Sequence, residues 1–312
     1  MSSLEPSGDL PLVIQTSIAT DSRDVYALLL WMADRALSQP GTGSDEVLRK
    51  PVQGLITALH WFGVEKHHAV DAVMNQLMRF PALTPDAFQD VLRCPGMEVN
   101  GWWRSMIPPS PDELEAALPV AVGPSEHWGW EAVLGRDEGQ VEGGDSARRG
   151  VMRNREMLIY AQRAFIARRF KDYDPADRET WENYDRPWDF DHILALRFVP
   201  HVRFHHKEAV KQWASGSIAN LRAWPREDNR SDQDITPGSK IASAGRLTDS
   251  FLTEDERCGL GHGVSALDPE NKNTADLEAF VRAARARLVR IYTAWWGPDG
   301  LNIGHLTEAS DI

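Results

Sequence analysis

Seven apolar residues recur at helical spacing across residues 274–296, and this pattern constrains the fold of the chain more than any other feature. The residues follow one another at intervals that place them on one face of a long helix: Leu277, Phe280, Val281, Ala284, Leu288, Ile291 and Trp295. A helix with such a stripe must bury it against other elements. The pattern therefore predicts a mainly α-helical fold that packs around this segment.

Shorter helical patterns fill the N-terminal part of the sequence between prolines and glycines. Helical spacing of apolar residues extends over residues 21–37, 53–62 and 66–79. Thr84 before Pro85 is typical of a helix start, and Ser110 with Glu113 three residues later predicts a capping box. We therefore expect a helical N-terminal region.

A charged, glycine-rich stretch separates this region from the rest of the chain. Residues 135–150, GRDEGQVEGGDSARRG, contain five glycines, a composition typical of a surface connection. We predict a helical accessory region at 1–140 and a second domain at 141–312. The second domain is expected to begin with one long helix from Met152 to Phe170.

The charge of the chain limits its interaction with nucleic acid. The formal net charge is -12, which argues against a protein that coats nucleic acid through bulk electrostatics. Residues 148–171 nevertheless hold eight basic residues and one acidic residue, and a second basic segment occupies residues 281–290. Each segment is either a solvated helix face or a surface that faces phosphates.

Composition also suggests where the protein resides. The longest apolar run, Tyr26 to Ala33, is too short to cross a bilayer, and the N-terminus does not resemble a secretion signal. Cys94 and Cys258 lie far apart and are interpreted as free thiols. We expect a cytoplasmic protein without a membrane span.

Two carboxylates and a histidine interrupt the apolar stretch WDFDHILAL at residues 188–196. In a strand, Asp189 and Asp191 point to the same side, where their combined negative charge requires a cation or several hydrogen-bond donors. His192 follows directly. A metal ion would supply this compensation, as would several donors, so the stretch is a candidate metal site.

A second pattern follows at residues 217–240. The β-prone run SIANLRAW leads to Pro225, which suits the first position of a helix, and Asn229 lies one turn into that helix. The two patterns together resemble the HNH nuclease motif, also called the ββα-metal or His-Me finger motif. The segments that carry the resemblance are, in chain order, WDFDHIL, SIANL, EDNRSD and Lys240. This order is especially similar to the C-terminal nuclease domain of GmrSD-type restriction enzymes and SspE-like phosphorothioate-sensing phage-defence proteins.

The resemblance implies a fold and a set of site residues. The fold would be mainly α with a small ββα-metal motif whose core lies at 184–245. His192 would be the general base, and Asp191 and Asn229 would be the metal ligands. Asn220 would tie the motif loop together by hydrogen bonds. Asp189 would support the metal site, and Arg230 would contact phosphate.

The implied chemistry suits these residue types. Hard oxygen ligands favour Mg²⁺, with Mn²⁺ as a substitute, and the ion stabilises charge on phosphorus and on the leaving oxygen. A histidine with an ordinary pKa of about 6.5 is neutral often enough at pH 7 to accept a proton from water. We therefore expect an endonuclease that nicks double-stranded DNA in a restriction or phage-defence system.

The resemblance covers the C-terminal half of those proteins, and two of its positions differ. Ala195 stands where the family usually has proline, and Ala219 where it usually has glycine. The sequence has no glycine loop of the kind that cradles phosphate and no DGQQR-like segment. A nucleotide-hydrolysing domain or subunit is therefore an expected partner.

Three alternatives remain open at this point. The HNH scaffold could bind DNA or a partner subunit without cutting, or it could belong to an RNA-cutting toxin. A zinc site could use the segment HVRFHHKE, residues 201–208, although the sequence offers no second pair of ligands for it. Three other histidines, His60, His67 and His68, have no carboxylate or cysteine at metal-ligand spacing. The tryptophans are expected to pack in the core rather than to stack on bases: Trp102, Trp103, Trp128, Trp130, Trp295 and Trp296.

Overall fold

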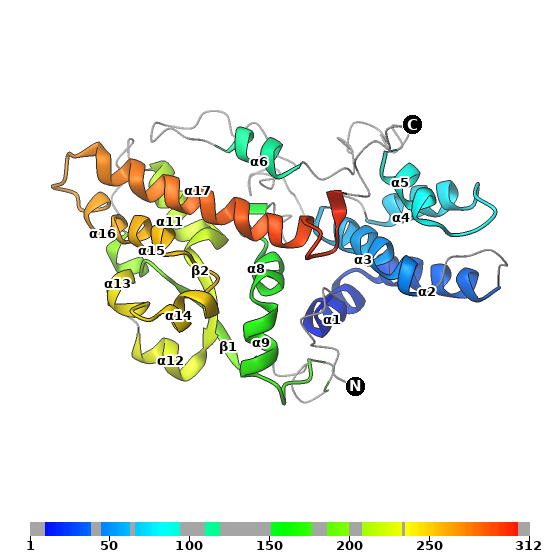
Figure 1. Ribbon diagram of the computed structural model, residues 1–312, viewed down its shortest axis with the longest axis horizontal. Coiled ribbons are helices and arrows are strands. Elements are labelled where there is room, and N and C mark those ends of the chain that lie inside the picture. The colour runs from blue at the N-terminus through cyan, green and yellow to red at the C-terminus, as the bar shows by residue number, and fades with distance from the viewer. Residues whose placement is uncertain are drawn as a thin grey trace.

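A computed structural model provides the structure of the protein. It describes residues 10–38, 45–62, 66–93, 110–118, 151–175, 177, 186–199, 208–232 and 235–304. Within these ranges the chain is mainly α-helical, as predicted, and holds one two-stranded sheet. Two groups of elements are joined by a long helix (Figure 1).

The first group is formed by N-terminal helices, which confirms the expected helical N-terminal region. Its helices are α1 (Leu12–Asp21), α2 (Arg23–Ser38), α3 (Asp45–Phe62), α4 (Lys66–Leu77) and α5 (Pro85–Arg93). The start of α5 is capped as expected, because Thr84 Oγ1 accepts a hydrogen bond from the Ala87 amide at 3.3 Å. Their apolar faces meet in a common core that includes Leu28 and Leu59.

Helix α6 (Pro111–Ala117) begins with the predicted capping box. Ser110 Oγ accepts from the Glu113 amide at 3.2 Å, and the Ser110 amide donates to Glu113 Oε2 at 2.8 Å. Two backbone donors that the helix leaves unpaired are thus satisfied. The helix lies against α17 (Thr274–Trp296) (Figure 1).

The predicted single helix at 152–170 is divided in the structure into η2 (Val151–Arg153), α8 (Arg155–Ala161) and α9 (Arg163–Arg169). The break falls at Gln162, whose side chain accepts from the Ala223 amide at 2.8 Å and donates to the Asp249 carbonyl at 2.6 Å. Helical periodicity could not reveal this break, because the partners of Gln162 lie far away in the sequence.

The sheet pairs β1 (Trp188–His192) antiparallel with β2 (Leu221–Pro225). Asp191 lies opposite Arg222, and His192 lies opposite Leu221. Helix α12 (Arg226–Ser231) begins directly after β2 and packs against both strands. The chain therefore has a strand, strand and helix unit at the position where the sequence motif lies.

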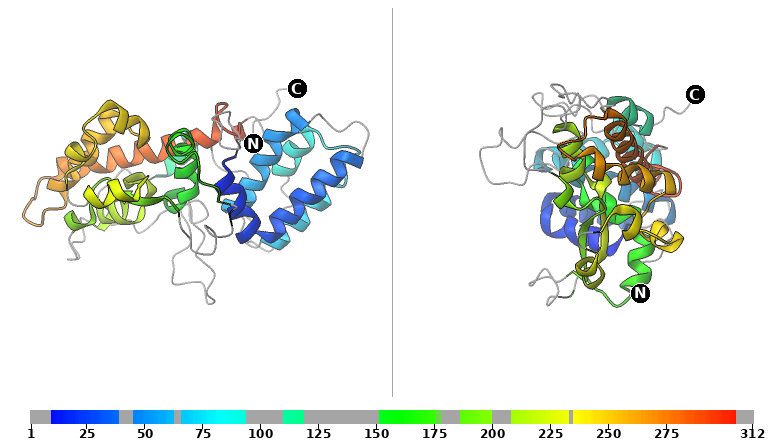
Figure 2. Two further views of the ribbon diagram at one scale, coloured as in Figure 1. Left: turned by 90° about the horizontal axis from the view of Figure 1, so that it is seen from below. Right: turned by 90° about the vertical axis from the view of Figure 1, so that its left-hand side faces the viewer.

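The other short elements surround this unit on the same side of the molecule (Figure 2). They are η3 (Leu196–Phe198), α11 (Glu208–Gly216), η5 (Ile218–Asn220), α13 (Pro237–Lys240), α14 (Ala244–Asp249), α15 (Glu254–Gly261) and α16 (Gly263–Ala266).

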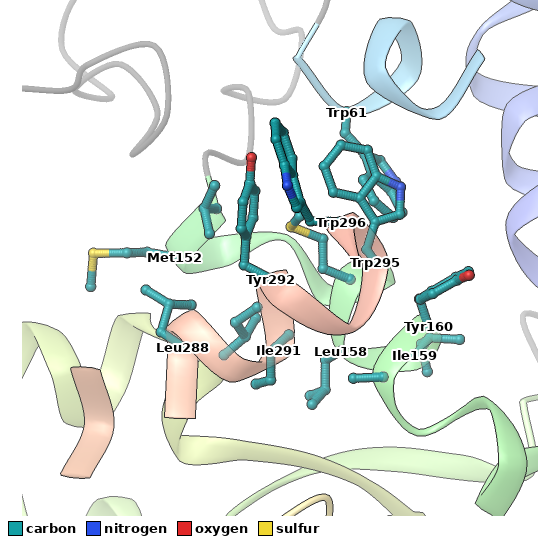
Figure 3. Packing of buried hydrophobic residues seen from close by; sticks show 14 of the residues in the cluster. Trp61, Met152, Leu158, Ile159, Tyr160, Leu288, Ile291, Tyr292, Trp295 and Trp296 are labelled. Carbon is teal, nitrogen blue, oxygen red and sulfur yellow. The ribbon is translucent and has the colours of Figure 1, made fainter. Parts of the chain in front are cut away.

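Helix α17 has the bounds that the apolar stripe predicts, and all seven residues of the stripe are buried. It extends from α16 to the N-terminal helices (Figures 1 and 2). At its C-terminal end, the ring of Trp295 lies 5.2 Å from the ring of Trp61, and Trp295 Nε1 donates to Thr57 Oγ1 at 3.2 Å. Figure 3 shows Tyr292 and Trp296 in the same cluster.

Trp295 and Trp296 therefore belong to the core, as predicted. The other four tryptophans named as candidates for base stacking, Trp102, Trp103, Trp128 and Trp130, lie outside the described residues.

A polar contact joins the N-terminal helices to α8. Glu156 Oε2 lies 2.7 Å from Trp61 Nε1 and 3.0 Å from His60 Nε2, and Ser17 Oγ donates to Glu156 Oε1 at 2.5 Å. The other ring nitrogen of His60 lies 2.6 Å from Ser22 Oγ. Burial raises the pKa of Glu156, but the hydrogen bonds and the charge of His60 outweigh burial, so the pKa lies below its ordinary value.

The His60 ring is therefore held in a structural contact, while the side chains of His67 and His68 lie outside the described set. The division of the chain into 1–140 and 141–312 stays a prediction, because residues 119–150 are not among those described. No helix in the described ranges is both long enough and apolar enough to cross a membrane.

Candidate functional site

The loop between β1 and η3 is held by the side chain of Asn220. Asn220 Oδ1 accepts from the Leu194 amide at 2.8 Å, and Asn220 Nδ2 donates to the carbonyls of Leu194 at 3.0 Å and Ala214 at 2.7 Å. The residue is fully buried, so each hydrogen bond forms without competition from water. Asn220 thus fixes the backbone that directly follows His192.

Asp191 is buried and contacts two cationic side chains. Arg222 Nε donates to its Oδ2 at 2.8 Å, and Lys240 Nζ donates to its Oδ1 at 2.7 Å. The Arg222 and Lys240 side chains are 0% and 1% exposed. A buried carboxylate needs this compensation, because an isolated charge in a protein interior is strongly unfavourable.

The ion pairs continue beyond Asp191 into a larger network. Arg222 Nη2 lies 3.1 Å from Asp232 Oδ2, and Arg246 Nη1 approaches the same oxygen at 3.2 Å. The guanidinium of Arg222 also lies 3.9 Å from the centre of the Trp224 ring. Burial lowers the pKa of Arg222, and the charges of Asp191 and Asp232 act against this decrease.

His192 ends β1 and is half-buried. Burial lowers the pKa of His192 below the ordinary value, and the charges of Lys240 and Arg155 add to this decrease. The charge of Asp191 and a hydrogen bond with the Ser215 backbone raise the pKa but do not cancel the decrease. The imidazole is therefore neutral near pH 7 and can accept a proton. Its own carbonyl accepts from Lys240 Nζ at 2.8 Å.

The remaining predicted site residues lie nearer the surface. The Asp189 side chain is 46% exposed, and its Oδ1 lies 3.7 Å from Arg226 Nε. Asn229 is half-buried and Arg230 is exposed, both on α12. The structure thus brings Asp191, His192 and Asn220 together at the end of β1, and it places Asn229 and Arg230 on the helix that packs against this strand.

A cation already lies at the proposed metal ligand. In the part of the chain that the structure describes, no group of three or more His, Cys, Asp or Glu residues could hold a metal ion. Lys240 Nζ, however, lies between Asp191 Oδ1 and the His192 carbonyl oxygen. These two hard oxygen donors suit Mg²⁺ in chemical type, and a divalent ion at Asp191 Oδ1 would take the place of this ammonium.

The alternative zinc segment gives no further site. Residues 201–207 lie outside the described residues, and Glu208 is described only by its backbone position at the start of α11. The zinc hypothesis therefore stays a prediction.

Three residues of the ion network at the site were not identified from the sequence: Arg222, Asp232 and Arg246. A signal for Arg222 exists, because an arginine in the apolar run SIANLRAW becomes buried if that run forms a strand. The partner of Arg222 depends on the register of β1 against β2, which places Arg222 opposite Asp191. Asp232 offers no such signal, since it follows a polar helix.

Comparison of the chain with protein-family models, with curated proteins and with solved structures gives no match. The functional assignment therefore depends on the residues and geometry described above.

Proposed function

We propose that this chain is an HNH-type endonuclease that cleaves DNA with Mg²⁺. The observation that carries the proposal is the strand, strand and helix unit in which His192 ends β1 beside Asp191 and Asn229 lies on the helix directly after β2. This order of elements is the one that the ββα-metal resemblance implies. The buried hydrogen bonds of Asn220 support it, because they hold the loop after His192.

Each residue has a role in this proposal. His192 accepts a proton from the attacking water, and its lowered pKa leaves the imidazole unprotonated near pH 7. Asp191 and Asn229 would hold the ion, with Asp189 as support and Arg230 toward a phosphate. When bound, Mg²⁺ or Mn²⁺ supplies charge stabilisation at phosphorus and at the leaving oxygen.

The sequence resemblance supports a wider setting for this activity. One metal site cuts one strand in each encounter, so nicking of double-stranded DNA is the expected product. The setting we propose is a cytoplasmic restriction or phage-defence system, including one that senses phosphorothioate, with a nucleotide-hydrolysing partner.

The test is conversion of supercoiled plasmid to open circles in Mg²⁺, with and without nucleotide-hydrolysing partners, on modified and unmodified DNA. We expect His192→Ala to lower the nicking rate by about 100-fold or more, the range that general-base catalysis provides. His262→Ala is the matched control, because His262 is exposed and pairs with Asp276 away from the site. An unchanged rate in folded His192→Ala would remove His192 from the reaction.

A second candidate function is favoured by the ion pairs of Asp191. Both of its oxygens contact cations, an arrangement that suits a scaffold that binds DNA or a partner without cutting. Wild-type protein that shifts DNA in a gel but does not nick it in Mg²⁺ or Mn²⁺ would favour this candidate over the first.

A further inference from the structure

Asp191 has one fixed oxygen and one exchangeable oxygen. Arg222 holds Oδ2 through Nε, while its two other nitrogens contact Asp232 and Ser250 and its guanidinium stacks on Trp224. Displacing Arg222 would break all of these contacts together. The fixed oxygen is therefore Oδ2.

Lys240 holds Oδ1 in a different way. Its ammonium is a point charge on a flexible four-carbon stem, and it donates to Asp191 Oδ1 and to the His192 carbonyl. Its backbone is anchored separately, because the Lys240 carbonyl accepts from Arg246 Nη1 at 2.8 Å. The side chain can therefore leave Asp191 while α13 stays in place.

Two oxygen atoms hold the ammonium of Lys240. A carboxylate oxygen and a carbonyl oxygen lie 2.7 and 2.8 Å from Lys240 Nζ, and both are ligand types that Mg²⁺ and Mn²⁺ take in proteins. An ammonium and a divalent ion cannot share these oxygens, because like charges at this distance repel strongly in a buried site.

We propose that Lys240 is the resident counter-ion of the candidate metal site, and that a divalent ion binds Asp191 Oδ1 only in exchange for the Lys240 ammonium. This inference rests on the proposed function, since it takes Asp191 as the metal ligand. Lys240 is then a positioning residue that sets the metal affinity of the site. It weakens the binding of a free ion and keeps the buried carboxylate neutralised when no ion is bound.

The first test measures Mn²⁺ binding by electron paramagnetic resonance, without DNA. We expect Lys240→Met to bind Mn²⁺ about tenfold more tightly than wild type, or better, because it removes the competing charge. Lys171→Met is the matched control, since Lys171 is an exposed lysine outside the network and its loss changes the net charge equally. Asp191→Asn in the Lys240→Met background is expected to abolish the tight binding.

Several results would overturn the proposal. A folded Lys240→Met protein that binds Mn²⁺ no more tightly than wild type and Lys171→Met would do so. Tight binding that persists after Asp191→Asn would also do so, because the ion would then lie elsewhere. Lys240→Gln keeps a hydrogen-bond donor without the charge, and it replaces Lys240→Met in these comparisons if that variant does not fold.

A second measurement uses the wild-type protein and needs no substitution. Without metal, buried Lys240 is expected to resist an amine-acylating reagent, and saturating Mg²⁺ is expected to raise its reaction rate at least about fivefold as the ammonium leaves Asp191. Mass spectrometry measures the acylation of Lys240 and of exposed Lys171 in the same sample. A Lys240 that stays protected at saturating metal refutes the exchange.

These readouts separate the inference from the proposed function. A protein that exchanges Lys240 for Mn²⁺ but does not nick DNA would support the inference and contradict the endonuclease. A protein that nicks DNA in Mg²⁺ while Lys240 stays protected would support the endonuclease and contradict the exchange of Lys240.

Discussion

Replacement of Arg222 by methionine tests whether the buried ion network stabilises the fold. Arg222 compensates two buried carboxylates, Asp191 at 2.8 Å and Asp232 at 3.1 Å. Removal of one partner from a buried ion pair costs roughly 3–5 kcal/mol, because the other charge stays buried. Lys240 and Arg246 still contact the two acids, so we expect a loss of about 4 kcal/mol rather than twice the single-pair cost.

The assay is urea unfolding followed by tryptophan fluorescence. With a slope of about 2–3 kcal/mol per molar urea, a loss of this size lowers the midpoint by roughly 1.3–2 M. Arg226→Met is the matched control, because Arg226 and Asp189 are 35% and 46% exposed and lie 3.7 Å apart. A pair of this kind contributes about 1 kcal/mol or less.

A double variant tests the cause of the effect. Asp232→Asn is expected to destabilise the wild-type protein but to cost less in the Arg222→Met background, since it removes a charge that has already lost a partner. The reasoning is refuted if Arg222→Met shifts the midpoint no more than Arg226→Met does.

Two further predictions concern other buried contacts. Because the pKa of Glu156 is lower in the folded protein than its ordinary value of 4.5, its contribution to stability is present above pH 4.5 and is lost as the pH falls through the folded pKa. Unfolding free energies of wild type and Glu156→Gln should therefore differ near pH 7 and converge in acid; a constant difference would contradict this. Asn220→Ala should cost about 2–4 kcal/mol through the loss of buried hydrogen bonds, and a loss under 1 kcal/mol in urea unfolding would show that the loop after His192 holds without them.

Local signals in the sequence predicted much of the helical structure. The capping box at Ser110 and the apolar stripe of α17 depend on residues within a few turns, so the sequence pattern is sufficient to define them. The break at Gln162 depends instead on the Ala223 backbone and on Asp249, which only the tertiary fold brings near.

The candidate site could be predicted only in part. The resemblance implied that Asn220 ties the loop together, as its hydrogen bonds do. The roles that it implied for residues at the end of β1 and on α12 stay predictions. The resemblance did not reveal that Arg222 and Lys240 would both contact Asp191. A sequence with 34 lysines and arginines does not indicate which of them become buried, because burial of a cation depends on an acid that the fold brings opposite it.

The bond between Gln162 and β2 has a consequence for association between molecules. A strand at the edge of a sheet offers free amides and carbonyls to which an extended segment of another chain can add. The side chain of Gln162 takes both the amide and the carbonyl of Ala223, at 2.8 and 3.3 Å, and so occupies the position that an added strand would need. One glutamine amide thus blocks the addition of a further strand at the middle of β2, at the position opposite Phe190.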